Sequence, residues 1–339
     1  MGRVIGLGLI GCGHWGPKVA RSLASVGGDL RVLCDLDPAR LEPLRQRYPG
    51  SRATTDYRQA IADPGVEAVA VCTPVATHYE IAKAALEADR HVLVEKPLAD
   101  SVGRAEELVE LADRRGLVLH VDHTLVHSAG VQRIRSVIDS GEIGELLYID
   151  CVRINLGLFQ SDVNVLWDLA PHDLSVVCYL MDRRPRWVSA VGAAHLGRFE
   201  SQAYLTVKYD DSLIAHLHVN WLAPVKIRST LIGGSKRMIV YDDLAPSAKL
   251  RLYASGVVPN GGRSGRDPAP LELPIAHAPG PSLGAEGPLA SVCASFLRTI
   301  ATGEPALTDA RAALDVVRIL EGAQTSLARE GLRIQLDRP

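Results

Sequence analysis

Length, composition and charge narrow the class of protein. The chain has 339 residues, enough for two domains rather than one small core. Its residues are 47% hydrophobic and 22% charged, a balance that is ordinary for a globular enzyme and argues against disorder. The formal net charge of −2 gives no basic surplus, so we expect neither a nucleic acid nor an anionic membrane as a partner.

The sequence also lacks the usual signals for export and metal binding. No apolar run reaches the roughly 20 residues that a membrane helix needs. The apolar start, Met1–Gly16, is expected to be a first strand and its turn rather than a signal peptide. The six cysteines are scattered without a Cys-x-x-Cys pair, which is typical of free thiols in a reducing compartment. We therefore expect a cytoplasmic protein, and no metal site, because histidines and cysteines do not cluster at ligand spacing.

The first third of the chain alternates short apolar runs with amphipathic stretches. Continuous apolar strands joined by helices predict a parallel sheet covered on both faces and wound in the right-handed sense. We expect residues 1–122 to form this α/β, doubly wound domain. Its expected strands are Arg3–Ile10, Leu30–Cys34, Ala68–Cys72, His91–Val94 and Leu117–Val121, and its expected helices are Pro17–Val26, Pro38–Tyr48, Thr77–Ala88 and Ser101–Arg115.

Residues 123–339 have a different sequence pattern, in which apolar and polar residues mostly alternate with a period of two. This pattern predicts an α+β domain with a large, mostly antiparallel sheet and helices on one face. Ser255–Pro288 is rich in Gly and Pro and is expected to be a long surface loop. The expected helices are Ala129–Ser140, Leu169–Met181, Leu289–Thr302 and Asp309–Arg329, and the expected strands are Leu146–Asn155, Trp187–His195, Gln202–Tyr209, Leu213–Trp221, Arg228–Ile232, Arg237–Tyr241 and Lys249–Tyr253.

A glycine-rich turn follows the first expected strand and precedes a helix, with the pattern G-x-G-x-x-G. In that context the first glycine allows the tight turn, the second lets the backbone approach a pyrophosphate, and the third lets the helix pack on the strand. The N–H groups at the helix start would face the phosphates. The turn predicts a dinucleotide site at Gly11, Cys12, Gly13, His14, Trp15 and Gly16.

Asp35 follows the second expected strand, 22 residues after Gly13. A carboxylate at about this interval can accept hydrogen bonds from the adenosine ribose hydroxyls and repels a 2′-phosphate. Arg40 is nearby but belongs to the next helix. We therefore expect NAD rather than NADP, although Asp35 could instead only cap that helix, a role that Asp37 can also fill.

Polar residues follow two later strands, where the carboxyl ends of parallel strands face the binding crevice. Glu95-Lys96-Pro97 directly follows one strand, so Lys96 is expected at the nicotinamide end on a rigid element. Thr73-Pro74 follows the preceding strand and His78 begins the next helix, although a histidine there more often caps or packs than it catalyses. The cofactor contacts expected here are Thr73, Pro74, His78, Glu95 and Lys96.

Asp168 and His172 are spaced i, i+4 near the start of an expected helix and therefore share one of its faces. The carboxylate can orient the imidazole and favour the imidazolium after proton capture, which suits an acid–base pair. The apolar residues around the pair argue against a solvated surface pair. Asp173 is expected to be their outward-facing neighbour.

These motifs, in this order, resemble the glucose–fructose oxidoreductase / inositol dehydrogenase / rhizopine-catabolism family. The resemblance covers nearly the whole chain, because Gly141–Leu146 is similar to the start of that family's second domain. The stretches 153–157 and 162–173 resemble the branch that acts on nucleotide-linked sugars, including dehydrogenases that oxidise carbon 3 of UDP-N-acetylglucosamine or its uronic acid. Residues 13–17 resemble that branch too, although a tyrosine is commoner where His14 stands.

The resemblance implies an NAD-dependent oxidoreductase in which the second domain binds the substrate. It implies that His172 takes the hydroxyl proton, that Lys96 bonds to the same oxygen, and that Asp168 orients His172. It also implies homodimers or homotetramers packed through the second-domain sheet. The substrate contacts expected from it are Lys96, Arg153, Asn155, Asn164, Trp167, Asp168 and His172, although Arg153 and Asn155 could instead simply flank a strand.

Three other interpretations remain open. A free polyol, inositol or free-sugar dehydrogenase needs the same trio of side chains with a different pocket. A ketoreductase of deoxysugar or aminocyclitol biosynthesis would run the reaction in reverse. A dinucleotide-sensing protein would keep the fold and lose the chemistry; loss of Lys96 or His172 would be its signature, and both are present.

Overall fold

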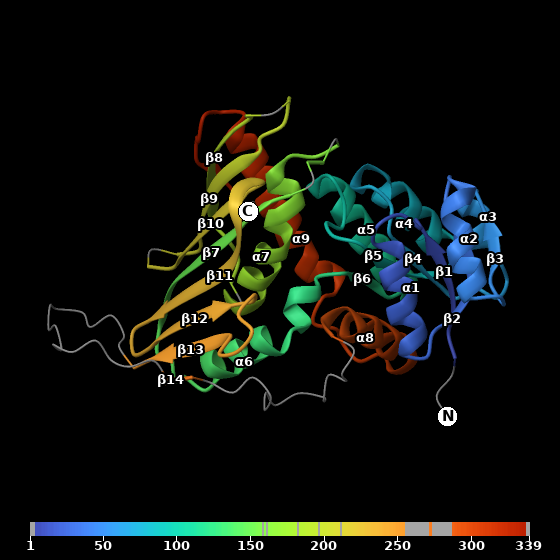
Figure 1. Ribbon diagram of the computed structural model, residues 1–339, viewed down its shortest axis with the longest axis horizontal. Coiled ribbons are helices and arrows are strands. Elements are labelled where there is room, and N and C mark those ends of the chain that lie inside the picture. The colour runs from blue at the N-terminus through green and yellow to red at the C-terminus, as the bar shows by residue number, and fades with distance from the viewer. Residues whose placement is uncertain are drawn as a thin grey trace, which may run out of the picture. The chain divides into compact units, whose positions relative to one another are not determined.

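The computed structural model describes residues 4–157, 159–160, 162–181, 183–195, 197–210, 212–254, 271–272 and 287–336. The chain divides into two compact units (Figure 1). The first unit comprises Met1–His127 and Leu283–Val317, and the second comprises Ser128–Ser282 and Arg318–Pro339. The first unit therefore takes up a segment that follows most of the second along the chain.

A six-stranded parallel sheet lies at the centre of the first unit, with the order β3-β2-β1-β4-β5-β6. This is the strand order of doubly wound folds that bind dinucleotides at the carboxyl ends of their strands. The strands are β1 (Gly6–Ile10), β2 (Asp29–Cys34), β3 (Arg52–Thr54), β4 (Ala68–Val71), β5 (His91–Val94) and β6 (Leu119–Val121).

Helices cover both faces of this sheet (Figure 1). They are α1 (Gly16–Ser25), α2 (Pro38–Arg47), α3 (Tyr57–Ala62), α4 (His78–Glu87), α5 (Val102–Arg115), α8 (Pro288–Thr302) and the start of α9 (Ala310–Leu327), with short 3-10 turns η1 (Val75–Thr77) and η2 (Thr124–His127). Strand residues such as Leu7 and Leu9 pack with α1, α2 and α8. Strand residues whose side chains lie on the other face of the sheet, such as Val69 and Val92, pack with α3, α4, α5 and α9. Burial on both faces explains why these strands are almost uniformly apolar.

The second unit is built on a nine-stranded sheet with the order β14-β13-β12-β11-β7-β10-β9-β8-β15. Among its described strands β7 and β10 form a parallel pair, and the other neighbours are antiparallel. The elements are α6 (Ala129–Asp139), β7 (Leu146–Leu156), α7 (Val165–Met181), β8 (Trp187–Ala193), β9 (Gln202–Lys208), β10 (Ile214–Asn220), β11 (Leu222–Gly234), β12 (Met238–Asp242), β13 (Leu250–Tyr253), β14 (Leu271–Glu272), the end of α9, and β15 (Ile334–Gln335).

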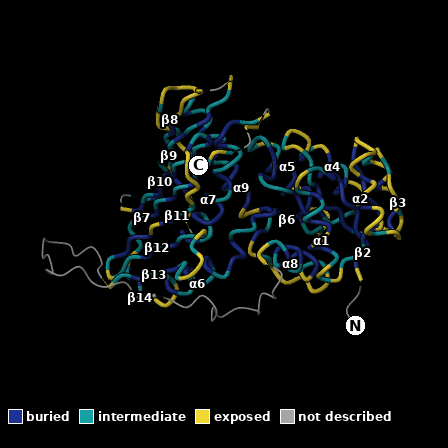
Figure 2. Tube along the Cα trace, viewed as in Figure 1, coloured by how far each residue is buried: buried dark blue, intermediate teal, exposed yellow. Residues whose placement is uncertain are grey.

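Side chains of β9 and β10 alternate strictly between buried and half-buried positions. The buried set, which includes Leu205 and Leu217, lies on the face against which α7 packs. The half-buried set includes Tyr204, His216 and His218 on the other face. In Figure 2 the strands of both units are mainly buried or intermediate, whereas exposed residues lie mainly in loops and on outer helix surfaces.

The predicted fold class is confirmed: a doubly wound parallel sheet precedes an α+β region with a large, mostly antiparallel sheet. The sequence analysis did not predict β3 and α3, and it began β11 and α7 too late. Of the loop expected at Ser255–Pro288, Leu271–Glu272 forms strand β14, and most of the remainder lies outside the described residues. None of the described helices is both long enough and apolar enough to span a membrane.

Candidate functional site

The glycine turn has the backbone geometry that a dinucleotide requires. Gly11 has a φ of +96°, and a Cβ there would lie 2.6 Å from the carbonyl oxygen of Cys72. At Gly16 a Cβ would lie 2.0 Å from the carbonyl oxygen of Gly11, because α1 begins directly against the end of β1. Around Gly13, by contrast, the one described atom within 4 Å of an added Cβ is Nη1 of Arg40, at 3.6 Å. The turn is therefore closed at its first and third glycines and open at the second, where a pyrophosphate would approach.

Helix α1 presents its amino end to this open side. Trp15 occupies the N-cap position and makes no side-chain capping bond, and Pro17 lies in the first turn. Pro17 has no N–H, and the N–H of Lys18 donates to the carbonyl oxygen of Trp15 at 2.8 Å, so this end attracts an anion chiefly through the positive end of the helix dipole. The residues present fit the phosphates of NAD.

Asp35 joins the end of β2 to the glycine turn. Its carboxylate is buried, with Oδ2 accepting the N–H of Cys12 at 2.7 Å and Oδ1 accepting the N–H of Asp37 at 2.9 Å. Nη1 of Arg40 lies 3.9 Å from Oδ1. Burial, followed by the charge of Asp35, raises the pKa of Cys12 to about 12, so this thiol is neutral. Asp37 caps α2 by accepting the N–H of Ala39, so Asp35 is not needed as the cap of that helix.

His78 links the segments that follow β4 and β5. Its Nδ1 lies 2.8 Å from the carbonyl oxygen of Pro97, and its Nε2 lies 2.8 Å from the carbonyl oxygen of Thr73. The side chain is buried, and this burial lowers its pKa although both hydrogen bonds oppose the shift. His78 therefore holds Thr73 and the residue after Lys96 at one edge of the sheet. It packs and bridges main chain there, the alternative that is commoner for such a histidine.

Helix α7 begins at a fully used cap. Asn164 accepts the N–H of Trp167 at 3.1 Å with its side-chain oxygen, and its carbonyl oxygen accepts the N–H of Asp168. Its side-chain nitrogen donates to Glu200 and to Gln324, each at 2.8 Å. Asn164 is buried, so these bonds fix the start of the helix and do not leave its amide for a substrate.

Asp168 and His172 lie one turn apart on α7, both of them only partly buried. The indole Nε1 of Trp221, which lies between β10 and β11, donates to Oδ2 of Asp168 at 3.0 Å. Trp221 is 2% exposed and Phe159 packs edge-on against it, so the donor is held rigidly. A fixed carboxylate one turn before an imidazole is the arrangement that orients an acid–base histidine.

Arg153 has a partner that the sequence did not indicate. Its Nε and Nη2 donate to the two carboxylate oxygens of Asp173, both at 2.7 Å, and both side chains are buried. The expectation that Asp173 points outward is therefore wrong: it is 6% exposed because it neutralises the arginine between β7 and α7. Asn155, two residues further along β7, is partly buried, and its Nδ2 would lie 2.6 Å from a Cβ added at Gly157.

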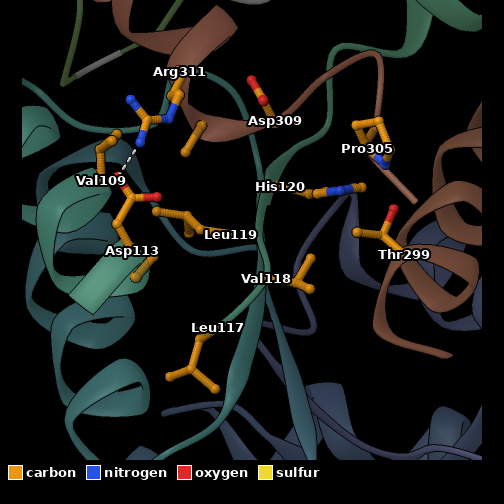
Figure 3. A pocket seen from close by; sticks show the side chains of 13 residues that line it. Val109, Asp113, Leu117, Val118, Leu119, His120, Thr299, Pro305, Asp309 and Arg311 are labelled. Carbon is orange, nitrogen blue, oxygen red and sulfur yellow. Dashed lines mark hydrogen bonds and ion pairs between the residues drawn. The ribbon is translucent and has the colours of Figure 1, made fainter. Parts of the chain in front are cut away.

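A pocket of about 180 Å³ lies elsewhere in the first unit (Figure 3). Its walls come from the end of α5, from residues 117–120 along β6, and from the segments around α8 and α9. His120, Thr299 and the Asp113–Arg311 ion pair supply its polar groups. Because the pocket flanks the edge strand rather than the carboxyl ends of the strands, it is not the candidate site.

Comparison with known proteins assigns the chain to a family. Residues 4–123 match the family described as "Oxidoreductase family, NAD-binding Rossmann fold", and residues 131–240 match the "GFO/IDH/MocA C-terminal domain". A solved structure described only as an oxidoreductase, from Magnetospirillum magnetotacticum MS-1, is 30% identical, with a TM-score of 0.79 over 95% of this chain and 100% of that one. The chain belongs to this family. The predicted family, the oxidoreductase class and NAD as cofactor are thereby confirmed.

Two curated relatives of the GFO/IDH/MocA family carry more specific names. UDP-N-acetylglucosamine 3-dehydrogenase of Acidithiobacillus ferrooxidans is 26% identical over 303 residues, which is 89% of this chain and 90% of that protein. Inositol 2-dehydrogenase of Mycolicibacterium smegmatis is 32% identical over 184 residues, which is 53% of this chain and 52% of that protein. These similarities differ in extent, and the first spans both units.

Sequence reasoning missed three residues around the site of this GFO/IDH/MocA protein. Trp221, 53 residues further along the chain, donates to Asp168. Asp122 accepts a hydrogen bond from Nε1 of Trp15 at 3.0 Å, and His123 is buried beside it. Both directly follow β6, and the rule that drew attention to Lys96 after β5, that strand ends face the crevice, could have found them.

Proposed function

We propose that this protein is an NAD-dependent dehydrogenase that moves a hydride to or from a ring hydroxyl of a sugar or cyclitol. The observation that carries the proposal is the Asp168 carboxylate, fixed at 3.0 Å by the indole of Trp221 one helical turn before His172. A dinucleotide fold alone accounts for cofactor binding. The oriented acid–base pair is what alcohol oxidation additionally needs.

The substrate we propose is a nucleotide-linked sugar oxidised at carbon 3, such as UDP-N-acetylglucosamine or its uronic acid. Support comes from the similarity to the Acidithiobacillus enzyme along nine-tenths of both chains. It comes also from the stretches 153–157 and 162–173, which resemble that branch of the family. Asn155 and Trp167 remain our candidates for contacts with the sugar.

Each catalytic side chain has a separate task in this proposal. His172 takes the proton of the reacting hydroxyl, and Asp168 orients its ring and stabilises the imidazolium. Lys96 donates a hydrogen bond to the same oxygen and stabilises the negative charge that develops there. The glycine turn, Asp35, Thr73 and Pro74 hold NAD, which supplies the hydride acceptor when bound.

A panel of substrates tests the proposal. We expect NADH to accumulate when the protein is mixed with NAD and UDP-N-acetylglucosamine or its uronic acid, and not with free hexoses or inositols. Turnover of inositols alone, in line with the Mycolicibacterium similarity, would replace the nucleotide-sugar assignment with a cyclitol dehydrogenase. Oxidation of NADH by the matching keto-sugars alone would indicate a ketoreductase. If no member reacts in either direction, the dinucleotide-sensing alternative stands.

We also propose that the protein assembles into homodimers or homotetramers through the sheet of the second unit. The face opposite α7 carries the exposed side chains of Ile227 and Leu231 on β11, half-buried Val152 and Ile154 on the adjacent β7, and exposed Val191 on β8. A second copy would bury these apolar side chains. Replacing Leu231 with Glu should shift the mass measured by light scattering toward the monomer; an unchanged mass would contradict this interface.

The six free cysteines support our proposal of a reducing, cytoplasmic location.

A further inference from the structure

Hydrogen bonds in the first unit connect the glycine turn to the main chain of Lys96. Nε1 of Trp15 donates to Oδ2 of Asp122 at 3.0 Å, and Oγ1 of Thr124 donates to Oδ1 at 3.1 Å. Glu95 and Asp122 directly follow the paired residues Val94 and Val121 of β5 and β6, and the N–H of Asp122 donates to the carbonyl oxygen of Val94 at 2.8 Å, so the two carboxyl groups are neighbours. A side-chain hydrogen bond with Asp122 is one of the causes that raise the pKa of Glu95. Glu95 in turn accepts the N–H of Lys96 with Oε2 at 3.1 Å. The connection therefore runs from the turn after β1, through the residue after β6, to the residues after β5.

Two carboxyl groups can be hydrogen-bonded to each other only if one of them carries a proton. Both oxygens of Asp122 already accept from other donors, as an ionised carboxylate does. Oε1 of Glu95 is buried and has no donor among the residues described. Glu95 is thus the group that holds the proton. Burial first, and then the nearby charge of Asp122, raise the pKa of Glu95 well above its usual range, in agreement with this assignment.

Apart from Asp122 and Lys96, the titratable groups described next to Glu95 carry no charge. Cys72 follows β4 and Cys293 lies on α8, and burial raises the pKa of both thiols well above their usual value. His123 follows Asp122, and burial followed by the charge of Lys96 lowers its pKa to about 3, which leaves a neutral imidazole. The charges that act on Glu95 are therefore the Asp122 carboxylate and the Lys96 ammonium group.

We propose that Asp122 and Glu95 share one proton and act together as a positioning pair for Lys96. Asp122, anchored by Trp15, keeps Glu95 neutral, and neutral Glu95 fixes the main chain of Lys96 by accepting its N–H. An ionised Glu95 would compete with the reacting oxygen for the ammonium group of Lys96. The inference rests on the proposed function, in which Lys96 bonds that oxygen. It also ties the position of Lys96 to the turn that binds the cofactor.

Infrared spectroscopy tests the protonation directly, on the complete protein and without a substrate. The difference spectrum of wild type minus Glu95→Gln at neutral pH should contain the C=O stretching band of a protonated carboxyl group. A spectrum with carboxylate bands only would overturn the proposal. This measurement needs only the glutamine variant, whose amide can donate to Asp122 as the protonated acid does.

A second experiment tests the effect of the pair on Lys96 through the direction in which the titration midpoint of Lys96 moves. In Asp122→Asn the new amide donates to Glu95, which should ionise and stabilise the Lys96 ammonium group. The midpoint for acetylation of Lys96 by acetic anhydride, followed by mass spectrometry, should move to higher pH by about one unit or more. Simple loss of the Asp122 charge would move it to lower pH, and that result, or no movement, would overturn the proposal.

A double variant completes the test. Adding Glu95→Gln to Asp122→Asn removes the carboxyl group that ionises, so the acetylation midpoint should return to or below that of wild type. A midpoint that stays high would show that Glu95 is not responsible. Because these readouts use neither NAD nor sugar, they can fail while the substrate panel succeeds, and the panel can fail while they succeed.

Discussion

The two parts of the candidate site are held in place by different kinds of groups. In the first unit, polar side chains at the strand ends bond to the backbone: Asp35 to the N–H groups of Cys12 and Asp37, and His78 to two carbonyl oxygens. On α7 they bond to other side chains, as Asp168 does to Trp221 and Asp173 to Arg153. The difference teaches that a dinucleotide turn can be positioned largely by main-chain bonds, whereas the side chains of α7 depend on individual partners that are distant in sequence.

The comparison first predicts which side chains, when removed, reduce the rate of hydride transfer most. Lys96→Ala and His172→Ala should each reduce kcat by about 10²–10⁴-fold, as loss of acid–base or charge-stabilising groups usually does. Rates measured at saturating NAD and sugar, together with the Kd for NADH, separate chemistry from cofactor binding. Arg114→Ala, which removes an exposed residue of α5, is the control and should keep the wild-type rate. Wild-type kcat in either active-site variant would remove that residue from the mechanism.

The Arg153–Asp173 pair should show the largest effect on stability. Asp173→Ala leaves a buried guanidinium without its bidentate partner, which should cost about 3–5 kcal/mol of unfolding free energy. Urea unfolding measures the loss. The matched control is Glu110→Ala, which breaks the exposed ion pair with Arg114 and should change stability little. If the two substitutions cost the same, the buried pair would not be a principal anchor of α7.

The same contrast explains which features of the fold and of the candidate site could be predicted from the sequence. The positions of the glycine turn, Asp35 and Lys96 after strands β1, β2 and β5 were predictable, because glycine spacing and strand ends report main-chain geometry. The partner of Arg153 was not predictable, because a contact between β7 and α7 leaves no mark in local periodicity. The packing of α8 with α1 in the first unit was equally hidden, since nothing in an amphipathic helix names the surface it covers. Short elements such as β3 fell below the length at which alternation can be recognised.

The Trp221 contact should have a smaller effect, confined to the second unit. Trp221→Phe keeps an aromatic ring but removes the donor to Asp168, a bond to a charged group worth about 1.5–3 kcal/mol. We expect kcat to fall by roughly tenfold or more, since each 1.4 kcal/mol is about a factor of ten, with the Kd for NADH unchanged. Restored activity in Trp221→His, if its ring nitrogen reaches Asp168, would confirm that the donor matters. A weaker Kd for NADH with unchanged kcat would contradict the assignment.

The smallest effect should come from the main-chain side of the comparison, at Gly13. A methyl group there meets only the flexible end of Arg40, at 3.6 Å, so Gly13→Ala should fold normally. It should nevertheless raise the Kd for NADH about tenfold, equivalent to 1.4 kcal/mol, because the methyl group occupies the side open to the pyrophosphate. Gly16→Ala is the matched contrast: its methyl group would lie 2.0 Å from the carbonyl oxygen of Gly11, so it should lower the melting temperature as well. If Gly13→Ala lowered the stability of the protein and left the Kd for NADH unchanged, the open side of the turn would be a packing surface. The turn would then not be the main-chain binding site that distinguishes the first unit from α7.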